Sequence, residues 1–154
     1  MDDTRLVITN DGWENVEATD VVTVHDYSKY GENFSEKYRA PKNDLYPMWK
    51  RLMAFGENLP DLPVMLSEYG GITVSKDGGW GYSGAEKGEE DFLKRFEKLN
   101  ENAFSGVFCG VCYTQLTDVE KETNGLLDER HNPKYSVSAI REIMDKFDEK
   151  EKIL

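Results

Sequence analysis

Val64-Met65-Leu66-Ser67-Glu68-Tyr69-Gly70-Gly71 is the stretch of sequence that decides the fold. Its first three residues form a continuous apolar run, which is typical of a parallel strand buried on both faces. Glu68 follows closely, and the two glycines at the end let the backbone turn tightly. A carboxylate held at a rigid strand end suits a nucleophile or a general base, and it suits equally a cap that accepts backbone N–H bonds.

Three further apolar runs predict strands of the same kind, at 6–9, 21–24 and 107–113. Each run is rich in β-branched or aromatic residues and closes on polar or glycine residues. Continuous apolar runs, rather than alternating ones, favour a sheet of parallel strands.

Helical patterns lie between these strands. Apolar residues recur at helical spacing over 45–53 and 86–100, and a third helix is predicted after Ser136 or Ser138 as its N-cap. This alternation predicts β/α units joined by right-handed crossovers. Four units are half of an eight-stranded barrel, which takes about 250 residues. The predicted fold class is therefore α/β, with four parallel strands and flanking helices as half of a TIM (β/α)8 barrel.

The chain of 154 residues carries 30 acidic and 19 basic side chains, a formal net charge of −11. Such a charge repels phosphate backbones and anionic lipid surfaces, so neither a nucleic acid nor a membrane is expected as a partner. Residues 1–5 lack the regions of a secretory signal, and no apolar run reaches about 18 residues. The chain as given is expected to be soluble and cytoplasmic, although its compartment stays undetermined.

Cys109 and Cys112 form a Cys-x-x-Cys pair within an apolar, β-favouring run. Residues three apart on a strand point to opposite faces, so the two thiols are expected to pack as core residues. A functional redox or metal pair is the alternative. No set of possible ligands has the spacing of a metal site, and neither a metal nor a cofactor is expected.

Polar or aromatic side chains follow the apolar part of every predicted strand. The C-terminal ends of parallel strands meet at one face of a β/α fold, where such folds place their active sites. The side chains expected to converge there are Asn10, Asp11, Trp13, His25, Asp26, Tyr27, Glu68, Tyr113 and Gln115.

Five segments of the chain resemble, in order, the catalytic domain of glycoside hydrolase family 2, which includes bacterial β-galactosidases, β-glucuronidases and β-mannosidases. The strongest is Ser67-Glu68-Tyr69-Gly70-Gly71, and the others are 4–14, 24–27, 112–120 and 124–127. The resemblance covers nearly the full chain. It implies that residues 1–154 are strands five to eight, the C-terminal half of the catalytic TIM (β/α)8 barrel.

The resemblance implies a retaining mechanism, in which a carboxylate after barrel strand seven attacks the anomeric carbon and a glutamate after strand four acts as acid and then base. Glu68 matches the nucleophile. The acid/base belongs to an Asn-Glu pair upstream of the segment matched by 4–14, and a retaining site needs both carboxyl groups about 5 to 5.5 Å apart. The isolated chain is therefore expected to be inactive, and its expected partner is an upstream half-barrel or a second copy.

Tyr27 is expected to hydrogen-bond Glu68 and hold it ionised, with a packed ring as the alternative. His25 and Asp26 would contact sugar hydroxyls, or else form a structural hydrogen bond.

Four further positions have two interpretations each. Trp13 and Trp80 would offer flat faces to a pyranose ring, or simply pack. Asn10 and Asp11 would bind hydroxyls, or only turn the chain.

The last predicted strand bears on the substrate. Tyr113-Thr114-Gln115 stands where many related enzymes carry a tryptophan-rich end, and Tyr113 and Gln115 are expected to line the sugar site. Glu122-Thr123-Asn124 lacks the lysine with which the glucuronidase branch grips the sugar carboxylate. Neutral β-linked sugars, β-galactosides first, are the predicted substrates. The alternative function is a non-catalytic carbohydrate-binding or assembly half-barrel.

Overall fold

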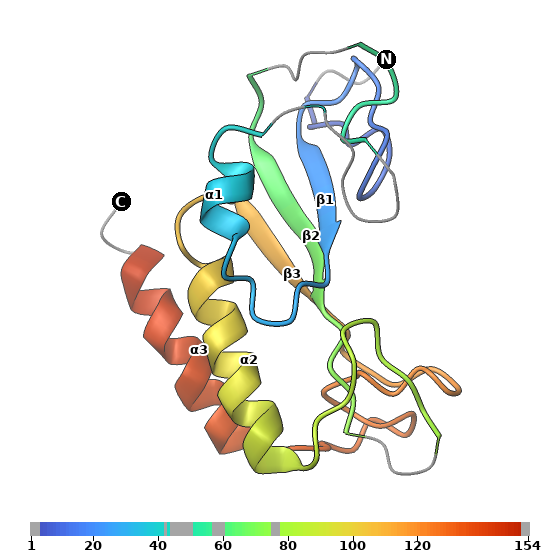
Figure 1. Ribbon diagram of the computed structural model, residues 1–154, viewed down its shortest axis with the longest axis vertical. Helices are drawn as coiled ribbons and strands as arrows, with labels where there is room; N and C mark the ends of the chain where they lie inside the picture. The colour runs from blue at the N-terminus through green and yellow to red at the C-terminus, as the bar shows by residue number, and fades with distance from the viewer. Residues whose placement is uncertain (1–3, 42, 44–50, 57–60, 75–77, 152–154) are drawn as a thin grey trace.

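The computed structural model describes residues 4–41, 43, 51–56, 61–74 and 78–151 (Figure 1). The strands form one parallel sheet in the order β1-β2-β3. The elements, in chain order, are β1 (Val22–Asp26), α1 (Phe34–Tyr38), β2 (Val64–Gly70), α2 (Glu89–Ala103), β3 (Gly110–Thr114) and α3 (Val137–Glu151).

The predicted fold class is wrong. The described chain is a small α/β domain with three parallel strands, not four strands of the C-terminal half of a TIM barrel. The run 6–9 forms no strand, because Leu6, Val7 and Ile8 are 77, 44 and 46% exposed. Val7 makes hydrogen bonds to the backbone and side chain of Asp20 instead of pairing with a strand. Apolar composition predicted a buried strand there, but no strand of the described chain lies against the segment to bury it.

The other three apolar runs do form strands. β2 begins at Val64 as predicted, and it continues through Glu68 to Gly70, so the carboxylate lies within the strand. β2 is also the central strand, with a parallel neighbour along each of its edges.

Two helices confirm their predicted patterns. α2 buries Phe92, Phe96 and Leu99 on one stripe, and its first turn is acidic, as the positive end of a helix dipole favours. Ser136 is the N-cap of α3, since its hydroxyl accepts the N–H of Ala139 at 3.3 Å. The helix predicted over 45–53 lies largely outside the described residues, and α1 was not predicted.

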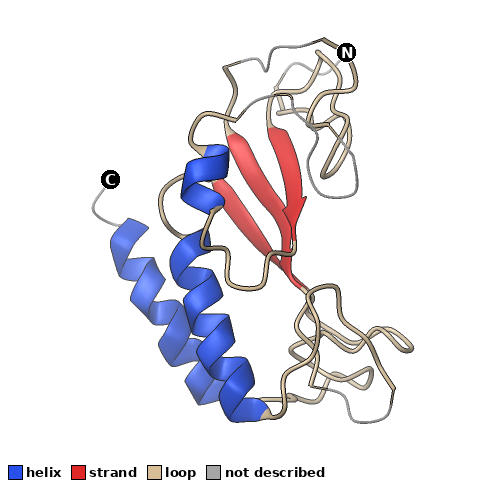
Figure 2. Cartoon of the chain, in the orientation of Figure 1, coloured by secondary structure: helices blue, strands red, loops and turns tan. Residues whose placement is uncertain are grey.

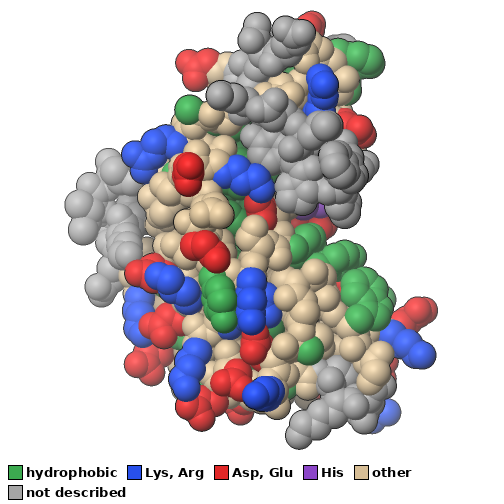
Figure 3. Space-filling model, viewed as in Figure 1, with side chains coloured by type: hydrophobic (Ala, Val, Ile, Leu, Met, Phe, Trp, Pro, Cys, Tyr) green, Lys and Arg blue, Asp and Glu red, His purple; other side chains and the backbone are tan. Residues whose placement is uncertain are grey.

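All three helices lie on one side of the sheet, and α2 and α3 run side by side (Figures 1 and 2). Phe104, which caps the end of α2, stacks on Phe147 of α3 with centroids 5.3 Å apart. Over the outer surface of these helices, acidic and basic side chains alternate (Figure 3), as in the pair Lys94–Glu90. The helices therefore cover one face of the sheet and leave the other face for the loops and the site.

Cys109 and Cys112 are both free and exposed, so the prediction that they are core thiols is wrong. β3 lies at an edge of the sheet, and side chains on an edge strand have fewer neighbours to cover them. Among the described residues, none of the helices is long and apolar enough to cross a membrane.

Candidate active site

β2 carries one residue more than either neighbouring strand between Leu66 and Tyr69. Leu66 pairs with Val24 and Glu68 with His25, a step of two residues in β2 against one in β1. The register against β3 shifts in the same interval. A bulge of this kind re-aims the side chains that follow it. Leu66 and Tyr69 therefore share the helix-covered face, whereas Glu68 and His25 lie together on the opposite face.

Tyr27, directly after β1, donates a hydrogen bond from its hydroxyl to Oε2 of Glu68. Burial raises the pKa of Tyr27, and the hydrogen bond to Glu68 raises it further. Tyr27 therefore keeps its proton and remains a donor to the carboxylate. The Glu68 side chain is 35% exposed, which leaves it open to a ligand.

His25 lies between two carboxylates. Its Nδ1 is 3.2 Å from Oε2 of Glu68, and its Nε2 is 3.1 Å from Oδ2 of Asp11. A neutral imidazole can donate through one nitrogen, whereas an imidazolium can donate to both carboxylates at once. The arrangement therefore places Asp11, His25 and Glu68 in one row, with a hydrogen bond between His25 and Asp11 and a close contact between His25 and Glu68.

The turn at 10–12 is fixed against β1 by Thr23. The N–H of Gly12 donates to Oγ1 of Thr23 at 2.7 Å, and the Thr23 hydroxyl donates to the Asn10 carbonyl at 3.0 Å. Gly12 has a φ of 87°, and a Cβ there would lie 2.6 Å from the His25 ring. Glycine at this position is what lets the imidazole lie against the turn.

Asp11 is ionised at neutral pH. Burial opposes its charged form, but hydrogen bonds with Ser67 and His25 outweigh the burial and lower the pKa of Asp11 below its ordinary value. Ser67, the extra residue of β2 in this interval, belongs to the segment Ser67-Glu68-Tyr69-Gly70-Gly71, but the sequence predicted no role for its side chain.

Asp26, next to His25 on β1, points to the helix-covered face and is 1% exposed. Its oxygens accept hydrogen bonds from the Ser28 N–H at 2.9 Å, the Lys37 Nζ at 2.5 Å and the Tyr38 hydroxyl at 2.8 Å. Burial raises its pKa, but the hydrogen bonds from Lys37 and Ser28 outweigh this and lower the pKa below its ordinary value. The structure thus separates Asp26 from Glu68.

Asn10 and Trp13 lie beside the site and make structural contacts there. The Asn10 amide donates to the Trp13 carbonyl at 2.5 Å. Trp13 is 6% exposed and turns its ring edge-on toward His25, with centroids 6.4 Å apart.

Tyr113 and Gln115, from β3 and the loop after it, also pack within the fold. Tyr113 lies edge-on to the rings of Tyr69 and Phe96 at 5.6 and 5.2 Å. The backbone of Gln115 pairs with Leu126 at 3.1 Å.

Tyr82 is the site residue that the sequence analysis missed. Its ring stacks on Tyr27 with centroids 4.5 Å apart and an interplanar angle of 18°, and it is 50% exposed. Trp80 stands edge-on to Tyr82 at 5.1 Å. The alternation of glycine and aromatic residues in Gly79-Trp80-Gly81-Tyr82 was the signal available in the sequence.

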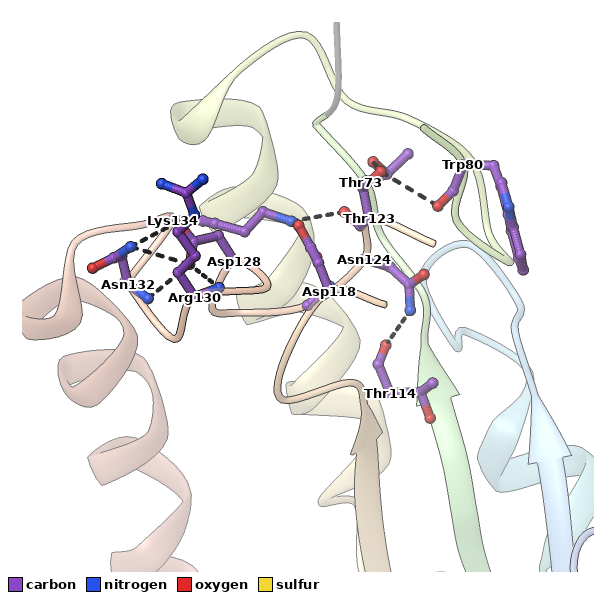
Figure 4. A network of polar contacts seen from close by, with 11 residues as sticks. Thr73, Trp80, Thr114, Asp118, Thr123, Asn124, Asp128, Arg130, Asn132 and Lys134 are labelled. Carbon is purple, nitrogen blue, oxygen red and sulfur yellow. Dashed lines mark hydrogen bonds and ion pairs between the residues drawn. The ribbon is translucent and has the colours of Figure 1, made fainter. Parts of the chain in front are cut away.

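The loop after β3 forms a polar network of its own (Figure 4). Lys134 Nζ lies 2.7 Å from Oδ1 of Asp118 and donates to the Thr123 carbonyl at 2.7 Å. The charge of this lysine is therefore paired inside the network. A cavity of about 610 Å³ opens beside Lys134 and Tyr135, and Glu68 is not among the residues that line it.

Asp11, His25 and Glu68 are also the group of described residues that could hold a metal ion, since one ligand atom from each lies within 4.8 Å of the others. Both ring nitrogens of His25 already face carboxylate oxygens at hydrogen-bonding distance. A metal ion would have to replace one of these contacts.

Fold and site together define a class: a small parallel α/β domain in which a glutamate, a tyrosine and a histidine meet on the open face of strands β1 and β2. No family model matches the chain, and no curated protein matches it. Among solved structures, the β-glucuronidase of Bifidobacterium dentium in complex with coumarin-3-O-glucuronide matches 84% of this chain, with 22% identity and a TM-score of 0.45. The chain is thus distantly similar in structure to a bacterial glycosidase, and the match covers 20% of that enzyme's chain.

Proposed function

We propose that this chain carries the nucleophile of a retaining β-glycoside hydrolase and that Glu68 is that nucleophile. The observation that best supports this proposal is that two neighbouring side chains contact the same oxygen of Glu68. Oε2 accepts the Tyr27 hydroxyl and faces Nδ1 of His25 at 3.2 Å. Both contacts hold the same oxygen, so the carboxylate is oriented and Oε1 is the atom that attacks.

The reaction proceeds in two displacements. An electron pair of Oε1 forms a bond to the anomeric carbon while the bond from that carbon to the leaving oxygen breaks, and the leaving oxygen takes a proton from a general acid. Water then gives a proton to the conjugate base of that acid as it attacks the same carbon, which releases the sugar and the free Glu68 carboxylate. Tyr27 and His25 act as positioning residues in both steps, because each holds Glu68 rather than the sugar.

Asp11 is close to Glu68 but is a poor proton donor. Their oxygens lie within 4.8 Å, similar to the spacing of a retaining pair. However, the lowered pKa of Asp11 keeps it ionised, and a general acid must be protonated before reaction. The family resemblance assigns this role instead to a glutamate of an Asn-Glu pair outside the matched segments.

The proposed substrate is a neutral β-linked sugar, with β-galactosides first. A sugar carboxylate would require a cation close by. Lys134 reaches the loop that contains Thr123, but its charge is paired with Asp118 at 2.7 Å. Asp11 and Glu68, both acidic, favour hydroxyl groups as hydrogen-bond donors over a second anion.

The test is covalent trapping with a dinitrophenyl β-galactoside that carries fluorine beside the anomeric carbon. Dinitrophenolate leaves without a proton, so the experiment needs no general acid, and the fluorine slows hydrolysis of the adduct. We expect mass spectrometry to place one sugar on the peptide that contains Glu68. Glu68→Gln should abolish labelling, while Glu90→Gln, which changes an exposed carboxylate on α2, should not. Saturable binding without a label would instead favour the non-catalytic carbohydrate-binding module.

A further inference from the structure

Three aromatic rings lead from the carboxylate to the surface. Tyr27 donates to Glu68, Tyr82 stacks on Tyr27 at 4.5 Å, and Trp80 stands edge-on to Tyr82 at 5.1 Å. Tyr82 and Trp80 are 50 and 46% exposed. We call Tyr82 and Trp80 the aromatic ledge.

The ledge is held in place by its backbone. The Trp80 N–H donates to the Lys121 carbonyl at 2.9 Å, and the Trp80 carbonyl accepts the Thr123 N–H at 2.9 Å. Figure 4 shows Trp80 beside the loop that contains Thr123, with its indole pointing away from the polar network. A Cβ on Gly81 would lie 2.5 Å from the Gly71 carbonyl oxygen, so the ledge loop sits directly on the turn after β2. An exposed indole on an anchored backbone loses little freedom when a ligand binds.

A buried cation fixes the ledge from the core. Arg95 on α2 is 2% exposed. Its Nη2 donates to the Ser83 carbonyl at 2.8 Å and its Nε to the Lys29 carbonyl at 2.9 Å. Ser83 follows Tyr82, and Lys29 lies two residues after Tyr27. One side chain thus ties together the two loops whose tyrosines stack.

Glu68 therefore has two unlike flanks. On one side, the exposed carboxylate of Asp11 offers oxygen atoms that can accept hydrogen bonds from hydroxyl groups. On the other side, Tyr82 and Trp80 offer apolar faces that are half exposed. A pyranose ring presents C–H groups on its face, and a phenyl ring presents π-electrons. Either ring can therefore stack on an aromatic side chain.

We propose that the aromatic ledge binds a flat ring in the leaving group, next to the sugar that the polar flank holds at Glu68. This proposal rests on the proposed function, because it takes the sugar to lie against Glu68. The leaving group must reach solvent after the bond breaks, and both rings of the ledge are about half exposed. The occupant is a phenyl ring or a second pyranose, which share the flat apolar face that the ledge recognises.

Calorimetric titration of the full chain tests the ledge without requiring turnover. Phenyl β-galactoside and lactose carry a second ring, whereas methyl β-galactoside lacks one. We expect Trp80→Ala and Tyr82→Ala to weaken binding of the two-ring ligands about tenfold and to leave the methyl glycoside within about twofold, as is typical for loss of one aromatic contact. Phe55→Ala, which removes another exposed aromatic ring, should change none of them. A dependence on Trp80 for phenyl alone identifies an aryl leaving group, and a dependence for lactose identifies a sugar.

Equal weakening for all three ligands would overturn the proposal, since it would mean that the ledge only supports the fold. A label on Glu68 with no preference for two-ring ligands would also overturn it, and the proposed function would stand. A Trp80-dependent preference with no label would retain the ledge as a ring-binding surface and remove Glu68 from catalysis.

Discussion

Asp26 and Glu68 lie near the C-terminal ends of adjacent strands, yet their surroundings are opposite. Asp26 is 1% exposed, and Lys37, Ser28 and Tyr38 occupy its oxygens. Glu68 is 35% exposed, and its contacts with Tyr27 and His25 fall on a single oxygen. The two carboxylates differ in the face of the sheet that they occupy, because one faces α1 and the other faces the open side. A saturated, buried carboxylate stabilises a fold, whereas an oriented and half-open one is suited to chemistry.

The largest effect that would test this comparison is expected for Glu68→Gln. The variant should release dinitrophenolate from an activated β-galactoside at least about a thousandfold more slowly, equal to about 4 kcal/mol in the barrier. Its free energy of unfolding should change by less than about 1 kcal/mol, because Glu68 is partly exposed and the glutamine amide can still accept the Tyr27 hydroxyl. Stopped-flow absorbance and urea denaturation measure the two quantities. A stable variant with ordinary release would place the nucleophile elsewhere.

Asp26→Asn should show the reverse pattern. The amide cannot accept charge-assisted hydrogen bonds from Lys37 and Ser28 in the same way, so the free energy of unfolding should fall by about 2 to 3 kcal/mol. Covalent trapping at Glu68, scored on the fraction of folded protein, should persist. If Asp26→Asn abolished trapping while leaving stability unchanged, the two carboxylates would not be separate in function.

Tyr27→Phe should have a smaller effect, which changes the rate of release at Glu68 but not the stability of the fold. It removes the hydroxyl that orients Glu68 but keeps the ring that stacks on Tyr82. Release of dinitrophenolate should slow about tenfold, equal to about 1.4 kcal/mol, with the unfolding curve unchanged. Tyr30→Phe, at another partly exposed tyrosine, is the matched control. A rate equal to that of the parent would show that the hydroxyl does not position Glu68.

The smallest effect concerns pH. The folded-state pKa of Asp26 lies below the ordinary value of 3.8. Its contribution to stability is therefore complete above that ordinary value and is lost as pH falls through the lowered one. The difference in unfolding free energy between the parent and Asp26→Asn should shrink below pH 3.8, measured by urea denaturation at a series of pH values. A constant difference would mean that the charge of Asp26 contributes nothing.

Sequence patterns predicted the elements that depend on local periodicity. The stripe of Phe92, Phe96 and Leu99 and the cap at Ser136 are examples, because helical spacing and capping chemistry are visible in the chain. The strand predicted at 6–9 does not form, because an apolar composition cannot show whether a neighbouring strand covers the segment. The same limit applies to Cys109 and Cys112, which lie on or beside an edge strand.

The site was predictable in part. Glu68, His25 and Tyr27 were expected to lie together because they follow or end neighbouring parallel strands. Asp26 belongs to the same tripeptide as His25 and Tyr27, but strand alternation turns it to the other face. Tyr82 escaped prediction because it reaches the site from a loop, where no periodicity points to a partner.

Because of its bulge, β2 should tolerate the deletion of one residue at one position. In a central strand, deletion of a residue normally reverses every side chain beyond it. Here Leu66 and Glu68 already pair with consecutive residues of β1, Val24 and His25. An in-frame deletion of the Ser67 codon would therefore restore regular pairing with β1 and leave Glu68 beside His25. A deletion of Met65 would instead move the side chains of the residues before it to the opposite face of the sheet.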